Sequence, residues 1–115
     1  MRRNPSPCRF CGRLPGPGQH RAPGPRGPIC ADCLEDGLLL VRDGRERISQ
    51  GGTALTLAPA AQACEFCDRT ERRTFFGRLR PLTRMGCTER GSVICAECLE
   101  RGGDLLNRIS RERTT

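Results

Sequence analysis

The apolar positions of the chain outline two amphipathic helices. In the first, Leu34, Leu38 and Val41 fall at positions i, i+4 and i+7, so they share one face of a predicted helix. This helix begins near Cys30, and an arginine followed by Gly44 predicts its C-terminal end. Neighbouring leucines widen the apolar stripe beyond what one thin module can cover. We therefore expect this face to contact a partner surface.

The second helix is predicted over residues 95–111. Leu99, Leu106 and Ile109 mark its apolar face, and its first turns contain two consecutive glycines. A glycine in a helix interior costs about 1 kcal/mol relative to alanine. We therefore expect this helix to kink early or to begin properly only at Asp104.

The segments between the helices show weaker patterns. Residues 13–28 contain five Pro and four Gly, which predicts an irregular loop rather than a regular hairpin. Residues 49–52 are linker-like, and residues 53–57 alternate weakly, as in a short strand. In the second half of the chain, strand formers at residues 74–76 and 92–94 predict a hairpin.

A seven-residue repeat divides the chain into two units. Residues 29–35 (ICADCLE) return as residues 94–100 (ICAECLE), and each copy follows an earlier Cys-x2-Cys pair. A boundary near Gly51 separates residues 1–51 from residues 52–115, and the second unit has a longer insertion between its cysteine pairs. The chain has four Phe and neither Trp nor Tyr. Units of about fifty residues with so few large apolar groups need a metal, disulfides or a partner to fold.

Eight of the nine cysteines fall into two sets with the spacing of a four-thiolate zinc site. Structural zinc sites fill all four tetrahedral positions with protein ligands, so no position remains for a reactive water. The pattern therefore predicts two structural Zn²⁺ ions and a chain that is not an enzyme. The predicted ligands are Cys8, Cys11, Cys30 and Cys33 in the first set and Cys64, Cys67, Cys95 and Cys98 in the second.

Disulfides are the alternative use of these cysteines. The first residues of the chain contain no apolar run typical of a signal peptide, and no segment reaches the roughly 18 apolar residues of a membrane span. A thioredoxin-like redox pair would need βαβ strands, which the pattern does not show. We therefore expect zinc rather than disulfides, in a reduced, cytoplasmic protein that is not associated with a membrane.

Two further residues could be taken for a ligand or a reactive group. His20 lies in the loop rich in Pro and Gly, and four cysteines already complete the first site, so we interpret it as an exposed loop histidine. Cys87 lies in the insertion of the second unit and has no partner in the motif. We expect a small, partly buried residue there.

The charge of the chain is basic but modest once zinc is counted. Two zinc tetrathiolate centres of charge −2 each would lower the formal charge of +7 to about +3. Arginines 9, 13, 69, 72 and 73 flank the cysteines and can offset these anionic clusters. All 20 basic residues are Arg, and the absence of Lys excludes a P-loop and Schiff-base catalysis. A small nucleic-acid-binding regulator is the alternative, although stacking aromatics and a concentrated basic helix are missing.

The cysteine motifs and their flanking residues resemble a known family of zinc-binding domains. C-x2-C-G at residues 8–12, a gap of eighteen residues and I-C-x2-C-L-E at residues 29–35 are similar to the ClpX-type four-cysteine zinc-binding domain, found at the N-terminus of the ClpX unfoldase. Phe10 and Phe66 precede the second cysteine of each early pair, as in that family. The second copy departs from the pattern by its longer insertion.

This resemblance implies a small α+β fold of two treble-clef-like modules in tandem, each a knuckle, an irregular hairpin and a helix around one zinc. Domains of the family dimerise through apolar surface and recognise substrates or adaptor proteins for an ATP-driven unfolding ring. The chain has no ATPase region, so the resemblance implies a non-enzymatic module for dimerisation, adaptor binding or recognition of unfolded protein. Its partners would be itself or Clp-type substrates and adaptors. The two helices would pack as an internal version of the dimer, with the interface candidates Leu34, Leu38, Val41, Leu99, Leu106 and Ile109.

Overall fold

The computed structural model describes residues 6–15, 20–59, 62–69, 71–73, 76–77, 79–81 and 83–114, with the backbone alone for 71–73, 79–81 and 110–114. The described residues form a small α+β protein, as predicted. Neither of its helices is both long and apolar enough to cross a membrane. The helices are α1 (Ala31–Asp43) and α2 (Ala96–Thr114), and the strands are β1 (Arg21–Ala22), β2 (Ile29–Cys30), β3 (Arg47–Ile48), β4 (Ala54–Leu57), β5 (Glu71–Arg73), β6 (Leu79–Pro81), β7 (Arg84–Cys87) and β8 (Ser92–Cys95).

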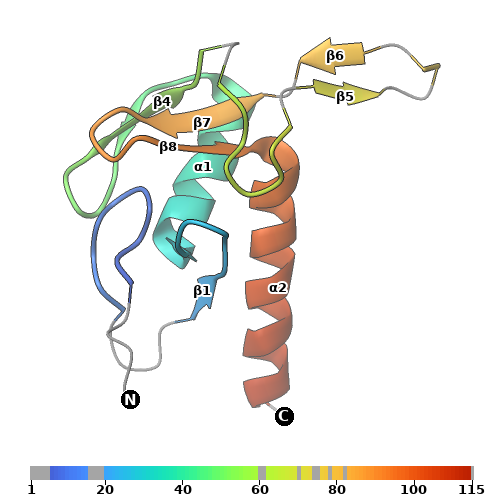
Figure 1. Ribbon diagram of the computed structural model, residues 1–115. Helices are drawn as coiled ribbons and strands as arrows, with labels where there is room; N and C mark the ends of the chain where they lie inside the picture. Colours follow the sequence, from blue (N-terminus) through green and yellow to red (C-terminus); the bar gives the residue numbers. More distant parts are fainter. Residues whose placement is uncertain are drawn as a thin grey trace.

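The two helices lie side by side and run in opposite directions (Figure 1). Each places a leucine from near its start against a glycine of the other: Leu34 lies over Gly102, and Leu99 lies over Gly37. A Cβ atom at Gly102 would lie 2.8 Å from Leu34 Cδ2, and one at Gly37 would lie 2.6 Å from Leu99 Cδ2. Glycine at both positions therefore permits the close approach of the helices.

The prediction that the second helix kinks early or begins only at Asp104 is wrong. α2 is one helix from Ala96 to Thr114 and includes both glycines, despite their low helix propensity. Packing of Leu34 on Gly102 outweighs this propensity, because burial of a leucine side chain contributes about 2 kcal/mol. The first helix ends as predicted, since Gly44 has φ 71° and donates its backbone N–H to the carbonyl oxygen of Leu40 at 2.7 Å.

The apolar residues predicted for an interface mostly face the interior of the chain. Leu34 and Leu99 are buried between the two helices. The contact that the sequence assigned to a partner surface is therefore made, in large part, within the chain. The other candidates are half-buried: Leu38, Val41 and Leu106 pack against the core, and Ile109 lies further along α2.

A four-stranded antiparallel sheet, in the order β3-β4-β7-β8, lies across the upper end of the helix pair in Figure 1. The short strand predicted at residues 53–57 is confirmed as β4. Residues 92–94 of the predicted hairpin lie in β8, which pairs with β7 along residues 84–87, and their pairing with residues 74–76 stays a prediction. Residues 88–91 form the tight turn between these two strands, in which Gly91 has φ 64°. Thr74 and Phe75 lie outside the described residues.

The segment predicted to be a linker is an ordered turn. Ser49 and Thr53 are buried, and the backbone N–H of Ser49 donates to the carbonyl oxygen of Thr53 at 2.8 Å. A side chain at Gly51 would collide with the carbonyl oxygen of Cys11, so the turn lies directly against the first cysteine pair. We call residues 47–57, which comprise β3, this turn and β4, the connector hairpin. The division of the chain at residues 51 and 52 stays a prediction.

Two further hairpins complete the described strands. β1 and β2 pair over two residues each, so the loop of residues 13–28 is irregular except for this short ladder; residues 16–19 lie outside the described part. β5 and β6 pair within the longer insertion of the second unit. They project from the rest of the chain (Figure 1). The insertion therefore adds a separate hairpin rather than enlarging the four-stranded sheet.

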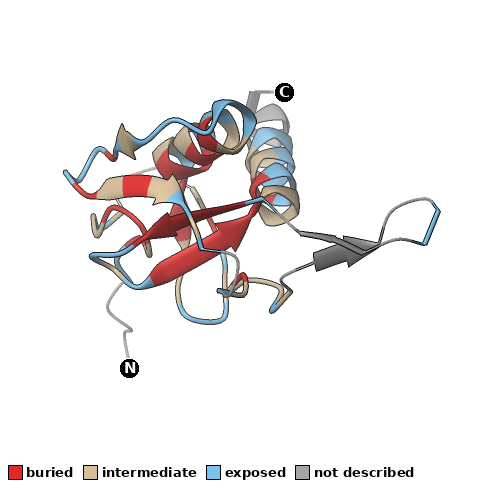
Figure 2. Ribbon diagram, turned by 90° about the horizontal axis from the view of Figure 1, so that it is seen from above, coloured by how far each residue is buried: buried red, intermediate tan, exposed pale blue. Residues whose placement is uncertain are grey.

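One hydrophobic core joins the two halves of the chain. It includes Phe10, Ile29 and Leu40 from the first half and Met85 and Ile94 from the second. Figure 2 shows that buried residues concentrate in β7 and β8 and on the facing sides of the helices. All four cysteines of the first set belong to this core, and those of the second set belong to it or pack against it.

Candidate metal centres

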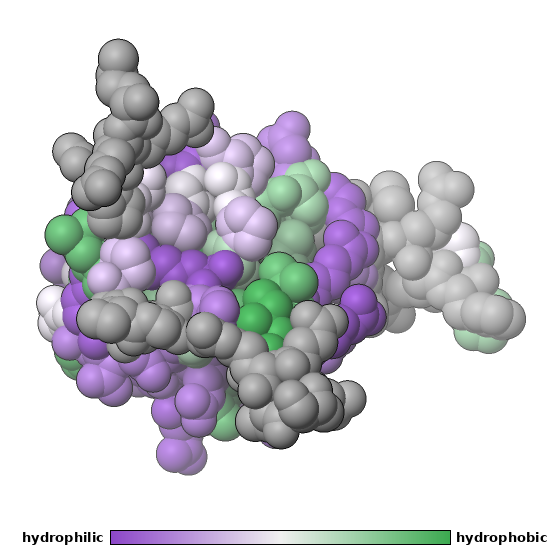
Figure 3. Space-filling view, turned by 90° about the horizontal axis from the view of Figure 1, so that it is seen from below, coloured by the Kyte–Doolittle hydropathy of each residue, from purple (hydrophilic) through white to green (hydrophobic). Residues whose placement is uncertain are grey.

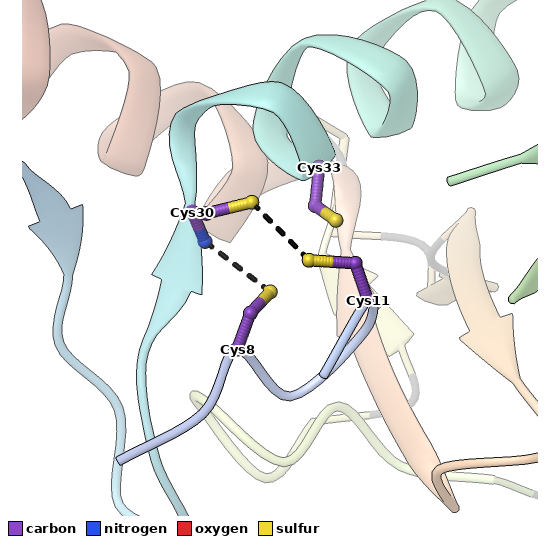
Figure 4. Close-up of side chains that lie close together, drawn as sticks. All are labelled: Cys8, Cys11, Cys30 and Cys33. Atoms are coloured by element: carbon purple, nitrogen blue, oxygen red, sulfur yellow. Dashed lines mark hydrogen bonds between the residues drawn. The ribbon is translucent and has the colours of Figure 1, made fainter. Parts of the chain in front are cut away.

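The first cysteine set comes together at the start of α1. Cys8 and Cys11 lie in a turn, Cys30 is the N-cap residue of the helix, and Cys33 lies in its first turn. The four Sγ atoms all lie within 4.8 Å of one another, and Cys11 Sγ lies 3.7 Å from Cys30 Sγ. Figure 4 shows the four thiols gathered around one point.

The second set repeats this arrangement at the start of α2. Cys64 and Cys67 lie in a turn, and Cys95 and Cys98 lie at the end of β8 and in the first turn of the helix. Their Sγ atoms also lie within 4.8 Å of one another. The distance is 3.8 Å between Cys64 and Cys98 and 3.7 Å between Cys67 and Cys95.

These sulfur separations fit a tetrahedral metal ion. Four sulfurs at the zinc–sulfur distance of about 2.3 Å would lie about 3.8 Å apart, whereas the two sulfurs of a disulfide lie about 2 Å apart. All nine cysteines are free thiols. Both sets of four can therefore each hold a metal ion of the zinc type, and all eight predicted ligands belong to them.

The two sites are equivalent residue for residue. Residues 8–13 align with residues 64–69, and residues 28–43 align with residues 93–108, without gaps. The backbone contacts repeat as well: Arg9 donates its N–H to the carbonyl oxygen of Pro28 at 2.9 Å, and Glu65 donates to that of Val93 at 3.0 Å. Each early cysteine pair is thereby fixed against the strand that leads to the later pair.

Each early turn requires a residue in the left-handed region. Gly12 has φ 75° and donates its N–H to the carbonyl oxygen of Cys8 at 3.0 Å. In the second site Asp68 has φ 62° and donates to the carbonyl oxygen of Cys64 at 2.7 Å. Aspartate adopts this conformation more readily than most residues, although glycine does so at lower cost.

The first cysteine of each site accepts two backbone N–H groups. Cys8 Sγ accepts from Phe10 and Cys30, both at 3.4 Å. Cys64 Sγ accepts from the equivalent residues, Phe66 and Cys95, both at 3.3 Å. Hydrogen bonds to a sulfur stabilise its thiolate form, which is the form that binds metal.

In the metal-free protein, these surroundings lower the pKa of some thiols and raise the pKa of others. Side-chain hydrogen bonds from Cys30 and Cys33 lower the pKa of Cys8, and a side-chain hydrogen bond from Cys95 is the largest cause that lowers the pKa of Cys64 to about 5. Burial, followed by the negative charge of Cys64, raises the pKa of Cys98 to about 12. Some thiols therefore hold protons that a metal ion must displace.

Arginine–carboxylate pairs stand beside both sites. Arg13 Nη2 lies 2.8 Å from Asp32 Oδ2 and 4.0 Å from Cys30 Sγ, and Arg69 Nη2 lies 2.5 Å from Glu97 Oε2. Both arginines are thus paired with carboxylates, and Arg13 also lies beside a cysteine sulfur of the first site, where its charge can offset that of a thiolate, as predicted for the flanking arginines. The side chains of residues 72 and 73, which belong to the same prediction, lie outside the described part of the chain.

Arg9 has a role that was missed in the sequence. Its Nε atom lies 2.9 Å from Glu65 Oε2, so it forms an ion pair with the equivalent residue of the other site. The Glu65 side chain is 6% exposed and that of Arg9 is 19% exposed. Alignment of the two repeats shows the signal, because opposite charges follow the first cysteine of each unit.

The two sites differ in burial. All four cysteines of the first set are buried, whereas Cys67 and Cys98 of the second are half-exposed. Phe10 in the first knuckle is fully buried, and the equivalent Phe66 is half-exposed. The connector hairpin explains the difference, because Thr53 Oγ1 donates to the carbonyl oxygen of Phe10 at 2.5 Å and the turn covers Cys11.

His20 and Cys87 lie in neither four-cysteine set, as predicted. Cys87 is 1% exposed and therefore more deeply buried than expected. Its thiol donates to the carbonyl oxygen of Phe10 at 3.5 Å. It therefore links the second half of the chain to the first knuckle, where a small side chain fits.

Comparison with family models, with curated proteins and with solved structures found no match. The sequence motifs and the geometry of the two cysteine sets therefore carry the functional argument. The chain is a small α+β protein with two four-cysteine clusters of zinc-binding geometry.

Proposed function

We propose that the chain is a non-enzymatic protein-interaction module built on two structural Zn²⁺ ions. The sulfur separations and the backbone N–H groups that surround Cys8 and Cys64 support zinc as the ion. Bound zinc would supply folding free energy, about 10–16 kcal/mol in small zinc peptides. A reducing compartment such as the cytoplasm would keep the thiols available for metal.

Each unit has the order of elements expected of a treble-clef-like module. In the first, the knuckle at residues 8–12 precedes the β1–β2 hairpin and α1. In the second, the knuckle at residues 64–68 precedes the β7–β8 hairpin and α2. This order supports the ClpX-type resemblance. Four cysteine ligands on each ion would leave no coordination position for a substrate, which supports a role in binding rather than catalysis.

The reciprocal contact between the helices carries the proposal. Leu34 on Gly102 and Leu99 on Gly37 are the same contact made twice, because Leu34 aligns with Leu99 and Gly37 with Gly102. Such reciprocity is typical of an isologous interface between two identical subunits. We infer that the chain is an internal version of a zinc-domain dimer. The ion pair between Arg9 and Glu65 favours this pairing of unlike units, since two copies of either unit would place like charges together.

Measurement of zinc content and of partner capture tests this function. We expect two zinc ions per chain, and partner capture by a tagged chain that is lost after zinc chelation and regained after zinc is restored. Cys8→Ser should reduce both, whereas Cys87→Ser, outside both sets, should reduce neither. Capture that is unaffected by zinc removal would contradict the proposal.

A nucleic-acid-binding regulator is the second candidate. One observation favours it: β5 and β6 project from the body of the chain and carry Arg72, Arg73 and Arg80 in their sequences. Binding to duplex and single strands, measured across a salt series, would decide between the two. Affinity that survives physiological salt would favour this candidate.

A further inference from the structure

An open apolar hollow lies beside α2. It has a volume of about 230 Å³ and is lined by residues from both halves of the chain, among them Ala22, Phe66, Cys98, Gly102 and Leu105. Leu105 is 39% exposed. Figure 3, which shows the molecule from below the view of Figure 1, shows an apolar area bordered by strongly hydrophilic residues.

The equivalent place beside α1 is filled. By alignment of the two halves, Leu105 corresponds to Leu40, Cys98 to Cys33 and Phe66 to Phe10. Leu40, Cys33 and Phe10 are each fully buried. The same set of residues therefore forms core in the first half and an open hollow in the second.

The connector hairpin fills the place beside α1. β4 packs against α1 and pairs with β7, with Thr56 opposite Gly86 and Leu57 opposite Met85. Leu55, which precedes Thr56 on β4, is fully buried. An extended strand with a leucine therefore covers the first half of the chain.

The second half offers a strand edge where such a strand could be added. Arg21 pairs with Cys30 as Arg84 pairs with Cys95, so β1 corresponds to β7. β7 is flanked by β4, whereas β1 pairs with β2 alone in the described part of the chain. Pro23 stands where β7 has Gly86 and lacks a backbone N–H, so an added strand would have a shorter ladder.

The charges beside the two places are opposite. Arg47 on β3 forms an ion pair with Asp43 at 2.6 Å and attracts Asp36, both on α1. The residues of α2 equivalent to Asp36 and Asp43 are Arg101 and Arg108. Both are exposed, they share a helix face, and no acidic side chain among the described residues pairs with them.

We propose that the hollow beside α2 docks an extended segment of a partner protein that pairs with β1. This segment would place a leucine in the hollow as Leu55 is placed beside α1, and acidic side chains against Arg101 and Arg108. Strand addition of this kind takes affinity from main-chain hydrogen bonds and specificity from side-chain pockets. The inference rests on the proposed function of protein interaction and adds its site and the chemistry of the partner.

A second copy of the chain fits this site poorly. Its connector hairpin has the required leucine but carries Arg47 where the site needs an acidic group. Like charges placed together at an interface select against a partner. Charge therefore favours a different, acidic segment.

Peptides based on the connector hairpin test the proposal. The probe is a fluorescent peptide of residues 44–59 that carries Arg47→Glu, and the comparison peptide has the unchanged sequence. Fluorescence anisotropy with the zinc-loaded full chain should give affinity about tenfold higher for the Arg47→Glu peptide, because two exposed charge pairs replace two repulsions. Equal affinity of the two peptides would overturn the proposal.

Variants of the chain locate the site. Leu105→Asp should abolish peptide binding, whereas Leu39→Asp, a matched control on α1 at 40% exposure, should leave it unchanged. The double substitution of Arg101→Glu and Arg108→Glu should reverse the preference and favour the unchanged peptide. Peptide binding that survives Leu105→Asp, or self-association of the chain that requires Leu105, would overturn the proposal.

These outcomes separate this inference from the proposed function. Zinc-dependent capture of protein partners that persists in Leu105→Asp would overturn the docking site and leave the interaction role intact. Failure of the zinc-loaded wild-type chain to capture any protein would contradict the interaction role itself.

Discussion

Leu40 and Leu105 occupy equivalent positions on the two helices, yet Leu40 is fully buried and Leu105 is 39% exposed. The same contrast holds for the cysteine sets, since the first is wholly buried and two cysteines of the second, Cys67 and Cys98, are partly exposed. Local sequence does not cause this difference, because the ligands and the knuckles are alike. The connector hairpin lies over the first unit, and no described strand lies at the equivalent place beside the second. Equivalent sequences therefore acquire different surfaces through one added segment.

Of the changes considered, removal of metal should lower the stability of both regions the most. Each zinc ion is expected to contribute about 10 kcal/mol or more of apparent folding free energy, more than the net stability of a typical small domain. Chelation should therefore unfold the chain, with loss of the backbone circular dichroism signal of the folded state. Retention of the native spectrum in the metal-free protein would show that the shared hydrophobic core folds the chain without metal.

Truncation of the two equivalent leucines, Leu40 and Leu105, should lower the free energy of unfolding by different amounts. Leu40→Ala removes a buried side chain and should lower the free energy of unfolding by about 2–5 kcal/mol. Leu105→Ala removes a partly exposed one and should cost less than about 1 kcal/mol. Denaturant unfolding of both zinc-loaded variants measures this difference. Equal losses would mean that the connector hairpin does not protect the first unit.

The contact that joins the regions can be broken at one glycine. Gly102→Ala places a methyl group against Leu34 and should destabilise the fold by about 1–3 kcal/mol, although alanine favours helix. The neighbouring Gly103→Ala is the control, because its Cβ would lie 3.6 Å from Leu38 Cδ1, an ordinary contact. We expect this variant to be neutral or more stable in thermal unfolding. Destabilisation of similar size in both would contradict close helix packing at Gly102.

Zinc affinity of the second site should rise with pH. The raised pKa of Cys98, about 12, keeps its thiol protonated at neutral pH in the metal-free protein, and zinc must displace this proton. Acid therefore competes with metal, and affinity should fall about tenfold per pH unit for each proton released. Competition with a chromophoric chelator at several pH values measures the slope. Affinity that is independent of pH would exclude proton displacement.

Loss of the ion pair between the two knuckles should lower the stability of the fold by a modest amount. Glu65→Gln leaves Arg9 without its carboxylate partner and should cost about 1–2 kcal/mol. A double-mutant cycle with Arg9→Gln isolates the pairwise term. A coupling energy near zero would mean that this ion pair does not favour the pairing of the first unit with the second.

The metal centres could be predicted from the sequence because their geometry is local. The two residues between the cysteines fix each ligand pair in a turn or at a helix start. Each unit of the repeat contains two such pairs, which supply the four ligands of one site. The first helix was predictable for the same reason, since Leu34 and Leu38 follow its periodicity and Gly44 ends it.

The errors arose where distant contacts outweigh local preference. Gly102 has low helix propensity, but Leu34 from the other helix requires it to be glycine. Gly51 lies in a linker-like sequence, yet it packs against Cys11, which is far away in the chain. The pairing of β8 with β7 likewise depends on the turn at residues 88–91, which the pattern of strand formers does not show.

Stepwise thiol labelling during zinc release tests the central contrast most directly. A slow chelator and a fast alkylating reagent should label Cys67 and Cys98 first, with one zinc ion still bound to the chain in native mass spectrometry. Cys11 and Cys33 should be labelled only after the second ion leaves, because the connector hairpin covers their site. Simultaneous labelling of both sets, or earlier labelling of Cys11 and Cys33, would contradict a covered first site and an open second one.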